Sequence, residues 1–137
     1  MKKIAIAVVV VVGVLLCSAF LKSDYENAVE DFLETIIKGD VDNAYDNLLK
    51  GTLLADRVES VQLQKQQTAQ LFDSYGKMLG FEQTKKQQYG QSLVRLVYIL
   101  KCEKMPVVWE LYYYKASNKW QLISLKSRDR LDMLANK

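Results

Sequence analysis

Apolar residues in the first part of the chain repeat three or four positions apart after Ser23. This spacing places side chains on one face of an α-helix. The members of the first stripe are Val29, Phe32, Leu33, Ile36 and Ile37. The members of the second are Val41, Ala44, Tyr45, Leu48 and Leu49. Ser23 with Glu26 forms a capping-box pattern, and Asp40 can cap the second helix. The pattern predicts two amphipathic helices joined at Gly39.

A third helix is predicted from about Asp56 to Leu79, with a less regular apolar stripe. Its middle is rich in amides, at Gln62, Gln64, Gln66, Gln67 and Gln70. Glutamine forms helices well, so this surface fits either a partner-binding helix or an exposed helix. Leu53 and Leu54, in the connection before it, are expected to be buried.

From Gly80 onward the pattern changes to the alternation of strands. Residues 91–102 place one apolar set on a single face, namely Val94, Leu96, Tyr98, Leu100 and Cys102. After a turn ending at Pro106, a second set does the same, namely Val107, Trp109, Leu111 and Tyr113. A further turn leads to a strand over residues 120–126. Residues 81–89 fit a leading edge strand or a loop, and residues 127–137 a tail or short helix.

Helices followed by strands indicate an α+β fold in which N-terminal helices pack on one face of a curved, cone-like antiparallel sheet. A length of 137 residues suits one domain. We expect residues 22–137 to form a single α+β domain of this kind, preceded by one N-terminal hydrophobic helix.

The segment before this domain follows Lys2 and Lys3 and is uncharged from Ile4 to Leu21. As a helix it would span about 27 Å, enough for the hydrocarbon core of a bilayer. Three interpretations remain open. Residues 4–21 could be a membrane anchor, a signal peptide cleaved after Ala19, or a lipid attachment segment at Cys17. All three place the domain outside the cytoplasm, either held at the membrane or released into the periplasm or medium.

The composition excludes several classes of enzyme. The chain has no histidine and two cysteines. A Ser-His-Asp triad and zinc sites that need imidazole are therefore excluded, and the thiols are too few for a metal cluster. We predict no catalytic residue, no metal site and no cofactor, and expect Cys102 to be a buried small hydrophobe.

Charge is divided between the two halves of the chain. Residues 20–76 carry 5 Lys and Arg against 11 Asp and Glu, whereas residues 77–137 carry 12 against 5. The basic surface candidates are Lys101, Lys115, Lys126, Arg128 and Arg130. They could face anionic lipid or an acidic partner, or be neutralised by the acidic helices of the same domain. Nucleic acid is not an expected partner. The helix pairs Glu26/Glu30 and Asp42/Asp46 are expected to be solvated.

Aromatic residues suggest a second kind of site. The ligand-pocket candidates are Tyr45, Tyr98, Trp109, Tyr113 and Trp120. The competing interpretation makes them core and sheet-surface residues. Because the sheet face away from the helices also carries aromatics, a protein partner or a homodimer could dock there.

Three stretches carry a resemblance to a known family: AVEDFLETIIKGDVDNAYDNL at residues 28–48, YGKMLG at residues 75–80 and NKWQL at residues 118–122. Together they resemble the nuclear transport factor 2-like superfamily, also described as cystatin-like cone folds, over roughly residues 24–127. The similarity is closest to small bacterial envelope domains of unknown function. The resemblance implies a cone-shaped space between sheet and helices, where the enzymes of the superfamily hold an acid or base.

Three functional hypotheses follow. The first is a non-enzymatic exported or membrane-anchored envelope domain that acts by protein contacts or weak ligand binding. The second is a pocket enzyme of isomerase or dehydratase type, with Tyr98 or Tyr113 as hydrogen-bond donor and a carboxylate as base. The third is a module that binds anionic membrane surfaces through its basic half.

Overall fold

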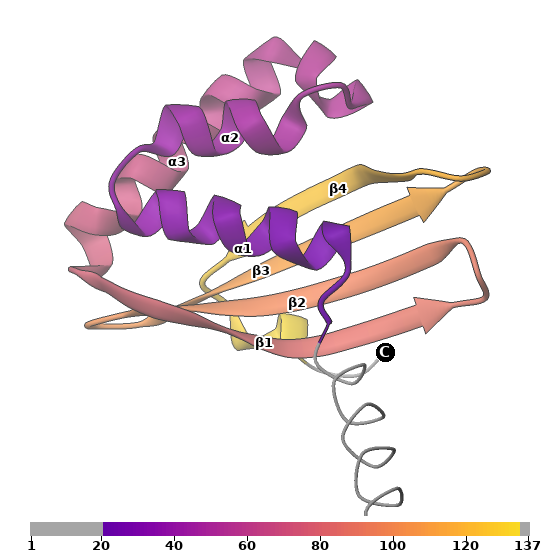
Figure 1. Cartoon of the computed structure of the whole chain (residues 1–137). Coiled ribbons are helices and arrows are strands. Elements are labelled where there is room, and N and C mark those ends of the chain that lie inside the picture. The colour runs from indigo at the N-terminus through magenta and orange to yellow at the C-terminus, as the bar shows by residue number, and fades with distance from the viewer. Residues whose placement is uncertain (1–20, 135–137) are drawn as a thin grey trace, which may run out of the picture.

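The computed structural model describes residues 21–134. In this range three α-helices, α1 (Asp24–Ile37), α2 (Val41–Leu49) and α3 (Val58–Tyr75), precede four strands. The strands are β1 (Met78–Tyr89), β2 (Leu93–Cys102), β3 (Pro106–Lys115) and β4 (Trp120–Arg128). Two short 3₁₀ helices, η2 (Leu53–Asp56) and η3 (Leu131–Leu134), precede α3 and follow β4. The strands form one antiparallel sheet in the order β1-β2-β3-β4, with α1 lying across one face (Figure 1). The α+β prediction is confirmed.

The hydrophobic helix predicted over residues 4–21 lies outside the described residues, apart from Leu21. Within the part of the chain that is described, no helix is both long enough and apolar enough to cross a membrane.

The predicted caps of the first two helices are present. The Ser23 hydroxyl accepts a hydrogen bond from the Glu26 amide, and the Glu26 carboxylate accepts one from the Ser23 amide. The Asp40 carboxylate accepts from the Asn43 amide at the start of α2. Between the helices, Gly39 has a φ of +87°, a conformation that costs glycine nothing and other residues more. The tight corner between α1 and α2 therefore follows from the sequence.

The core lies between α1, α2 and the sheet face that they cover. Phe32 of α1 is its central contact, because its ring meets Tyr45 of α2 and Trp109 of β3 edge-on, at centroid distances of 5.1 and 5.2 Å. All the strand residues predicted to face the helices on β2 and β3 are buried in this core. The alternation predicted for these two strands is confirmed.

Several predicted boundaries are wrong. The third helix ends at Tyr75 rather than Leu79, because Gly76 at φ +78° terminates it and Met78 begins β1. Of the two alternatives for residues 81–89, the edge strand is confirmed, and it begins three residues earlier, at Met78. β4 continues to Arg128, two residues further than predicted. Leu53, expected to be buried, is 80% exposed, because it lies on the outside of η2.

The sheet face away from the helices is also partly covered. Val97 and Val108 are buried there, beside an ion pair between Arg95 and Glu110 with an N–O distance of 2.7 Å. The η3 segment returns beneath the sheet on this side (Figure 1). The exposed large aromatics of the face, Tyr89 and Tyr114, lie near strand ends, where they do not form a broad apolar patch.

The stability of the core gives a matched test. Leu33→Ala, at a position that is 0% exposed, should lower the free energy of unfolding by about 2–5 kcal/mol, because it leaves a cavity under α1. Leu53→Ala on η2 should change it by less than about 0.5 kcal/mol. Urea denaturation of the full chain in neutral detergent, followed by tryptophan fluorescence, measures both. Equal losses in the two variants would contradict the observed packing.

Candidate functional site

A buried carboxylate lies where the start of α1 meets β1. Glu26 is 6% exposed, contrary to the predicted solvated face, because β1 covers it with two polar side chains. Its Oε1 accepts from the Lys86 ammonium at 2.7 Å and its Oε2 from the Gln83 amide at 3.0 Å. The Ser23 hydroxyl donates to the same Oε1 at 2.8 Å. Both carboxylate oxygens are thus engaged.

These hydrogen bonds decide the ionisation of Glu26. Burial alone would raise the pKa of the carboxyl, but the bonds from Lys86, Ser23 and Gln83 outweigh it and lower the pKa to about 2. Such a group stays ionised and paired at neutral pH. It is a poor proton acceptor, because a general base works best with a pKa near the working pH. Glu26 therefore joins α1 to β1 through these hydrogen bonds.

Four of the five ligand-pocket candidates are packed in two groups. Tyr45 and Trp109 enclose Phe32 in the core, and the Tyr45 hydroxyl is 2.8 Å from that of Thr68. Tyr113 and Trp120 contact the ring of Tyr25 at centroid distances of 5.4 and 5.3 Å. Burial raises the pKa of both Tyr45 and Tyr113 to about 12, so neither ionises readily at neutral pH.

Tyr98, the fifth candidate, is fully buried on β2. Its hydroxyl has no hydrogen-bond partner among the described residues. Burial, followed by the negative charges of Glu30 and Glu26, raises the pKa of this phenol well above its usual value. A buried donor near two carboxylates is the feature that the isomerase hypothesis needs. However, Tyr98 lines none of the three pockets described below.

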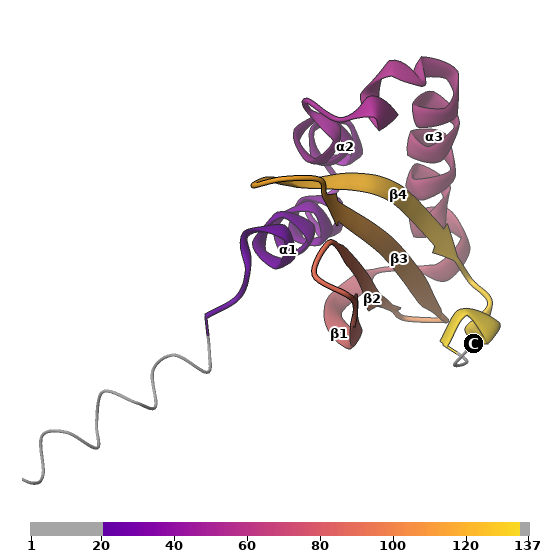
Figure 2. The same ribbon diagram turned by 90° about the vertical axis from the view of Figure 1, so that its right-hand side faces the viewer.

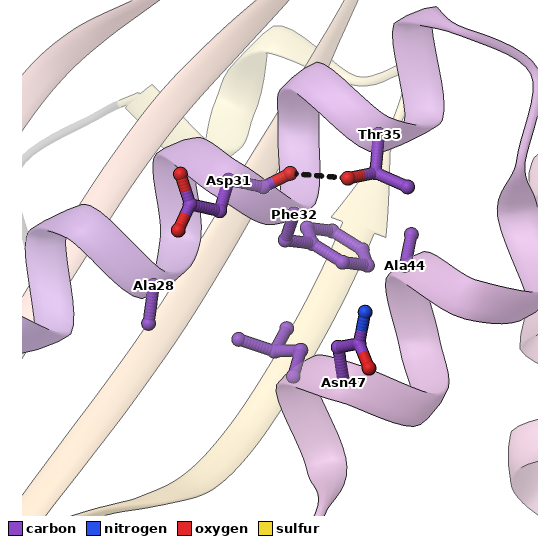
Figure 3. Close-up of a pocket in the computed structure, with 7 residues that line it drawn as sticks. Ala28, Asp31, Phe32, Thr35, Ala44 and Asn47 are labelled. Carbon is purple, nitrogen blue, oxygen red and sulfur yellow. Dashed lines mark hydrogen bonds between the residues drawn. The ribbon is translucent and has the colours of Figure 1, made fainter.

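One pocket, of about 230 Å³, lies at the junction of α1 and α2 (Figure 3). Asp31 of α1 and Asn47 of α2 line it from different helices, and the Phe32 ring points toward Ala44 (Figure 3). The Thr35 hydroxyl donates to the backbone carbonyl of Asp31 at 2.7 Å and is therefore already used. No nucleophile and base are paired here, and Asp31 and Asn47 alone define no recognisable chemistry.

The third helix differs from the others in how it is held. Along the whole of α3, which lies inside the described range, the buried residues are Lys65 and Thr68, and both are polar. Lys65 binds Asp46 and Asp42 of α2 at N–O distances of 2.8 and 3.4 Å. Thr68 donates to the Gln64 carbonyl, so its oxygen accepts from the hydroxyl of Tyr45. Polar contacts with α2 therefore position α3, and its apolar side chains remain incompletely covered.

Two hollows follow one another between α3 and the edge strand β4, beside which α3 stands (Figure 2). The first, of about 190 Å³, is lined by Arg57, Val61 and Gln64 of the α3 side and by residues 123–126 of β4. The second, of about 360 Å³, is lined by Gln67 and Leu71 of α3 and by residues 127–130. We name the two hollows together the α3–β4 groove.

The ends and the base of the groove are formed by named side chains. Leu49 and Leu54 line one end, next to η2. At the other end the Tyr75 hydroxyl donates to the Asp129 carboxylate and ties α3 to the segment after β4. Val107, buried on β3, lies at the base of the second hollow. The groove therefore has fixed walls on three sides.

The basic candidates separate into three places. Lys126, Arg128 and Arg130 all line the α3–β4 groove, and none of them makes an ion pair with another described residue. Lys101 pairs with Glu82 at 3.2 Å, at one end of the sheet. Lys115 lies over the Trp120 ring at 5.0 Å, at the other end. The sheet half is thus only partly neutralised by the acidic helices.

Sequence reasoning missed most of the groove. It named the three cations on and after β4, and it noted the glutamine-rich helix as a surface for a partner. Arg57, Val61 and Ile123 carried no signal, because they line the groove only once α3 is placed against β4.

The described residues contain no group of three or more cysteine, aspartate or glutamate side chains that could hold a metal ion. The free thiol of Cys102 is buried, which raises its pKa, as expected of an unreactive thiol. Comparison with family models gives no match, and comparisons with curated proteins and with solved structures give no significant one.

The ionisation of Glu26 predicts a specific dependence of stability on pH. Because its pKa is lower in the folded state than the ordinary value of 4.5, its stabilisation is complete above that value and is lost as the pH falls toward 2. Glu26→Gln should cost about 2 kcal/mol at pH 7 and flatten the loss of stability between pH 5 and 2. Urea denaturation across this pH range measures the effect. Glu59→Gln, on the exposed first turn of α3, is the control, and an equal acid slope in Glu26→Gln and wild type would contradict the pairing.

Two buried tyrosines give a second matched pair. Tyr45→Phe removes the hydrogen bond to Thr68 and should cost about 1 kcal/mol. Tyr98→Phe removes a hydroxyl without a partner and should leave the free energy of unfolding unchanged or higher. Thermal and urea denaturation of both variants provide the measurement. A larger loss from Tyr98→Phe than from Tyr45→Phe would show that the Tyr98 hydroxyl has a partner in solution.

Proposed function

We propose that this chain is a non-enzymatic domain, exported or held at a membrane by residues 4–21, that acts by binding another polypeptide. The observation that carries the proposal is the α3–β4 groove, which runs along an edge strand and is lined by both apolar side chains and cations. Unpaired strand edges and incompletely covered helices are the surfaces on which proteins dock extended segments.

The packing of the interior supports a non-enzymatic role. The space between α1 and the sheet is filled by Phe32, Trp109 and Tyr45, and Glu26 is fully engaged by its partners. A pocket enzyme needs a cavity in which a donor and a base face a substrate. Tyr98 lines none of the three pockets described above, so these pockets do not support the isomerase alternative.

The family and the location belong to the same proposal. The arrangement of helices on an antiparallel sheet is compatible with the cone-like fold of the nuclear transport factor 2-like superfamily, whose members share a shape but not a function. Within that resemblance, an envelope domain with a filled cone and an external groove accounts for the absence of histidine better than an enzyme does.

Site-specific photo-crosslinking in cells tests the function. A photoreactive phenylalanine analogue in place of Gln67 or Ile123 should give a covalent adduct with a distinct protein, because both positions line the groove. The same analogue in place of Leu63, exposed on α3 and not among the groove residues, is the matched control. Two outcomes would contradict a role in binding proteins. One is that every adduct is with lipid. The other is that no protein adduct forms at these positions or at several further positions on the surface.

A further inference from the structure

We propose that the α3–β4 groove binds an extended acidic segment of a partner protein, which adds to the sheet as a fifth strand beside β4. This inference rests on the proposed function and specifies the chemistry of the partner. It follows from three properties of the groove: an edge strand along one wall, two hollows with apolar side chains in their lining, and cations among the lining residues.

The edge strand determines the form of the partner. β4 pairs with β3 on one side only, so alternate backbone N–H and C=O groups on its other side have no partner in the sheet. An extended segment can satisfy these groups with main-chain hydrogen bonds, which supply affinity without requiring a particular sequence. Residues 123–128 of β4 line the groove over about 20 Å, the length of roughly six residues in a strand.

The two hollows determine where its apolar side chains go. The pairing of β3 with β4 contains a bulge: Tyr112 pairs with Ser124 and Tyr113 with Leu122, so Ile123 has no partner on β3. Ile123 is 46% exposed and lines the first hollow together with Val61. Leu71 and Val107 form the apolar part of the second. Because alternate side chains of a strand point the same way, an apolar residue at every second position can enter these hollows.

The charges of the groove determine the charge expected of the partner. Four of the residues that line the groove are cations, Arg57, Lys126, Arg128 and Arg130, and one is an anion, Asp129. Asp129 is already held by the Tyr75 hydroxyl, whereas the cations of the strand side make no ion pair with another described residue. Acidic side chains on the partner would pair with these cations and favour its encounter with the groove.

The same charges argue against two other occupants. A second copy of this chain, paired through its own β4, would bring Lys126 and Arg128 of both copies together, and like charges in an interface are unfavourable. A bilayer surface could contact the rim cations but would not reach Val107, which lies buried at the base between α3 and the sheet. An extended acidic segment uses both the rim and the base.

Selection of displayed peptides tests the inference with the full chain in neutral detergent. Random nine-residue peptides are selected, and their affinities are measured by fluorescence anisotropy at low and high salt. Enrichment of acidic peptides with apolar residues at alternate positions is expected, with binding that weakens as salt rises. N-methylation of peptide amides one at a time should abolish binding at every second position, as strand pairing requires.

Matched variants locate the binding. Lys126→Glu combined with Arg128→Glu should weaken binding about tenfold or more, whereas Lys104→Glu with Lys119→Glu, on exposed turns, should leave it unchanged. Ile123→Ser should weaken binding about threefold to tenfold, and Leu63→Ser should have no effect. Hydrogen exchange of β4 amides should slow when the peptide binds.

The remaining outcomes overturn the inference in distinguishable ways. Peptides that bind without any effect of the groove variants would refute this site and leave the proposed protein-binding function in place. If the chain selects no peptide, sediments as a dimer, and this dimer dissociates in the Ile123→Ser variant, the groove is occupied by a second copy of the chain. Binding to vesicles of anionic lipid, lost with the charge-reversed pair and without peptide selection, would identify a membrane-surface module. Failure to bind any of these probes would refute the inference and the proposed function together.

Discussion

The contact between α1 and the middle strands of the sheet is the interaction on which the rest of the structure depends. The Phe32 ring of α1 contacts Tyr45 of α2 and Trp109 of β3. The apolar side chains on the helix-facing side of β2 and β3 are all buried in this core. As a consequence, little apolar surface remains for α3 to bury. Apolar side chains of α3 such as Leu71 and Phe72 pack against the core only in part. Polar contacts with α2 and the hydrogen bond from Tyr75 to Asp129 also hold this helix.

This division of the fold separates the packed core from the proposed binding surface. The core contains the large aromatic side chains that could have lined a ligand pocket, and it also contains a carboxylate whose oxygens are both engaged. What remains open is peripheral: a groove between a weakly anchored helix and an edge strand, with cations that the acidic helices do not neutralise. Binding surfaces are commonly found on such less stable parts of a domain, because they must adjust to a partner.

The sequence allowed the core to be predicted and left the groove largely hidden. Regular spacing identified α1, α2 and the inward faces of β2 and β3, because those residues must all be buried together. The burial of Glu26 was missed because the sequence pattern of two acidic residues four positions apart is identical in two cases. In one the helix face is exposed to water, and in the other a strand with polar side chains packs against it. Leu53 was misplaced for the opposite reason, since an apolar residue in a connection can point outward. The groove depends on how α3 lies against β4, and no local pattern encodes that placement.

The central claim is that α3 stands outside the core and leaves the groove beside β4 open. Native-state hydrogen exchange of the full chain, with no partner present, tests it most directly. The amides of α3 should exchange at least about a hundred times faster than those of α1 and β2, because the apolar side chains of α3 are only partly buried and its fully buried residues are polar. Equal protection of α3 and α1 would mean that the third helix is an integral part of the core, and the account given above would then be wrong.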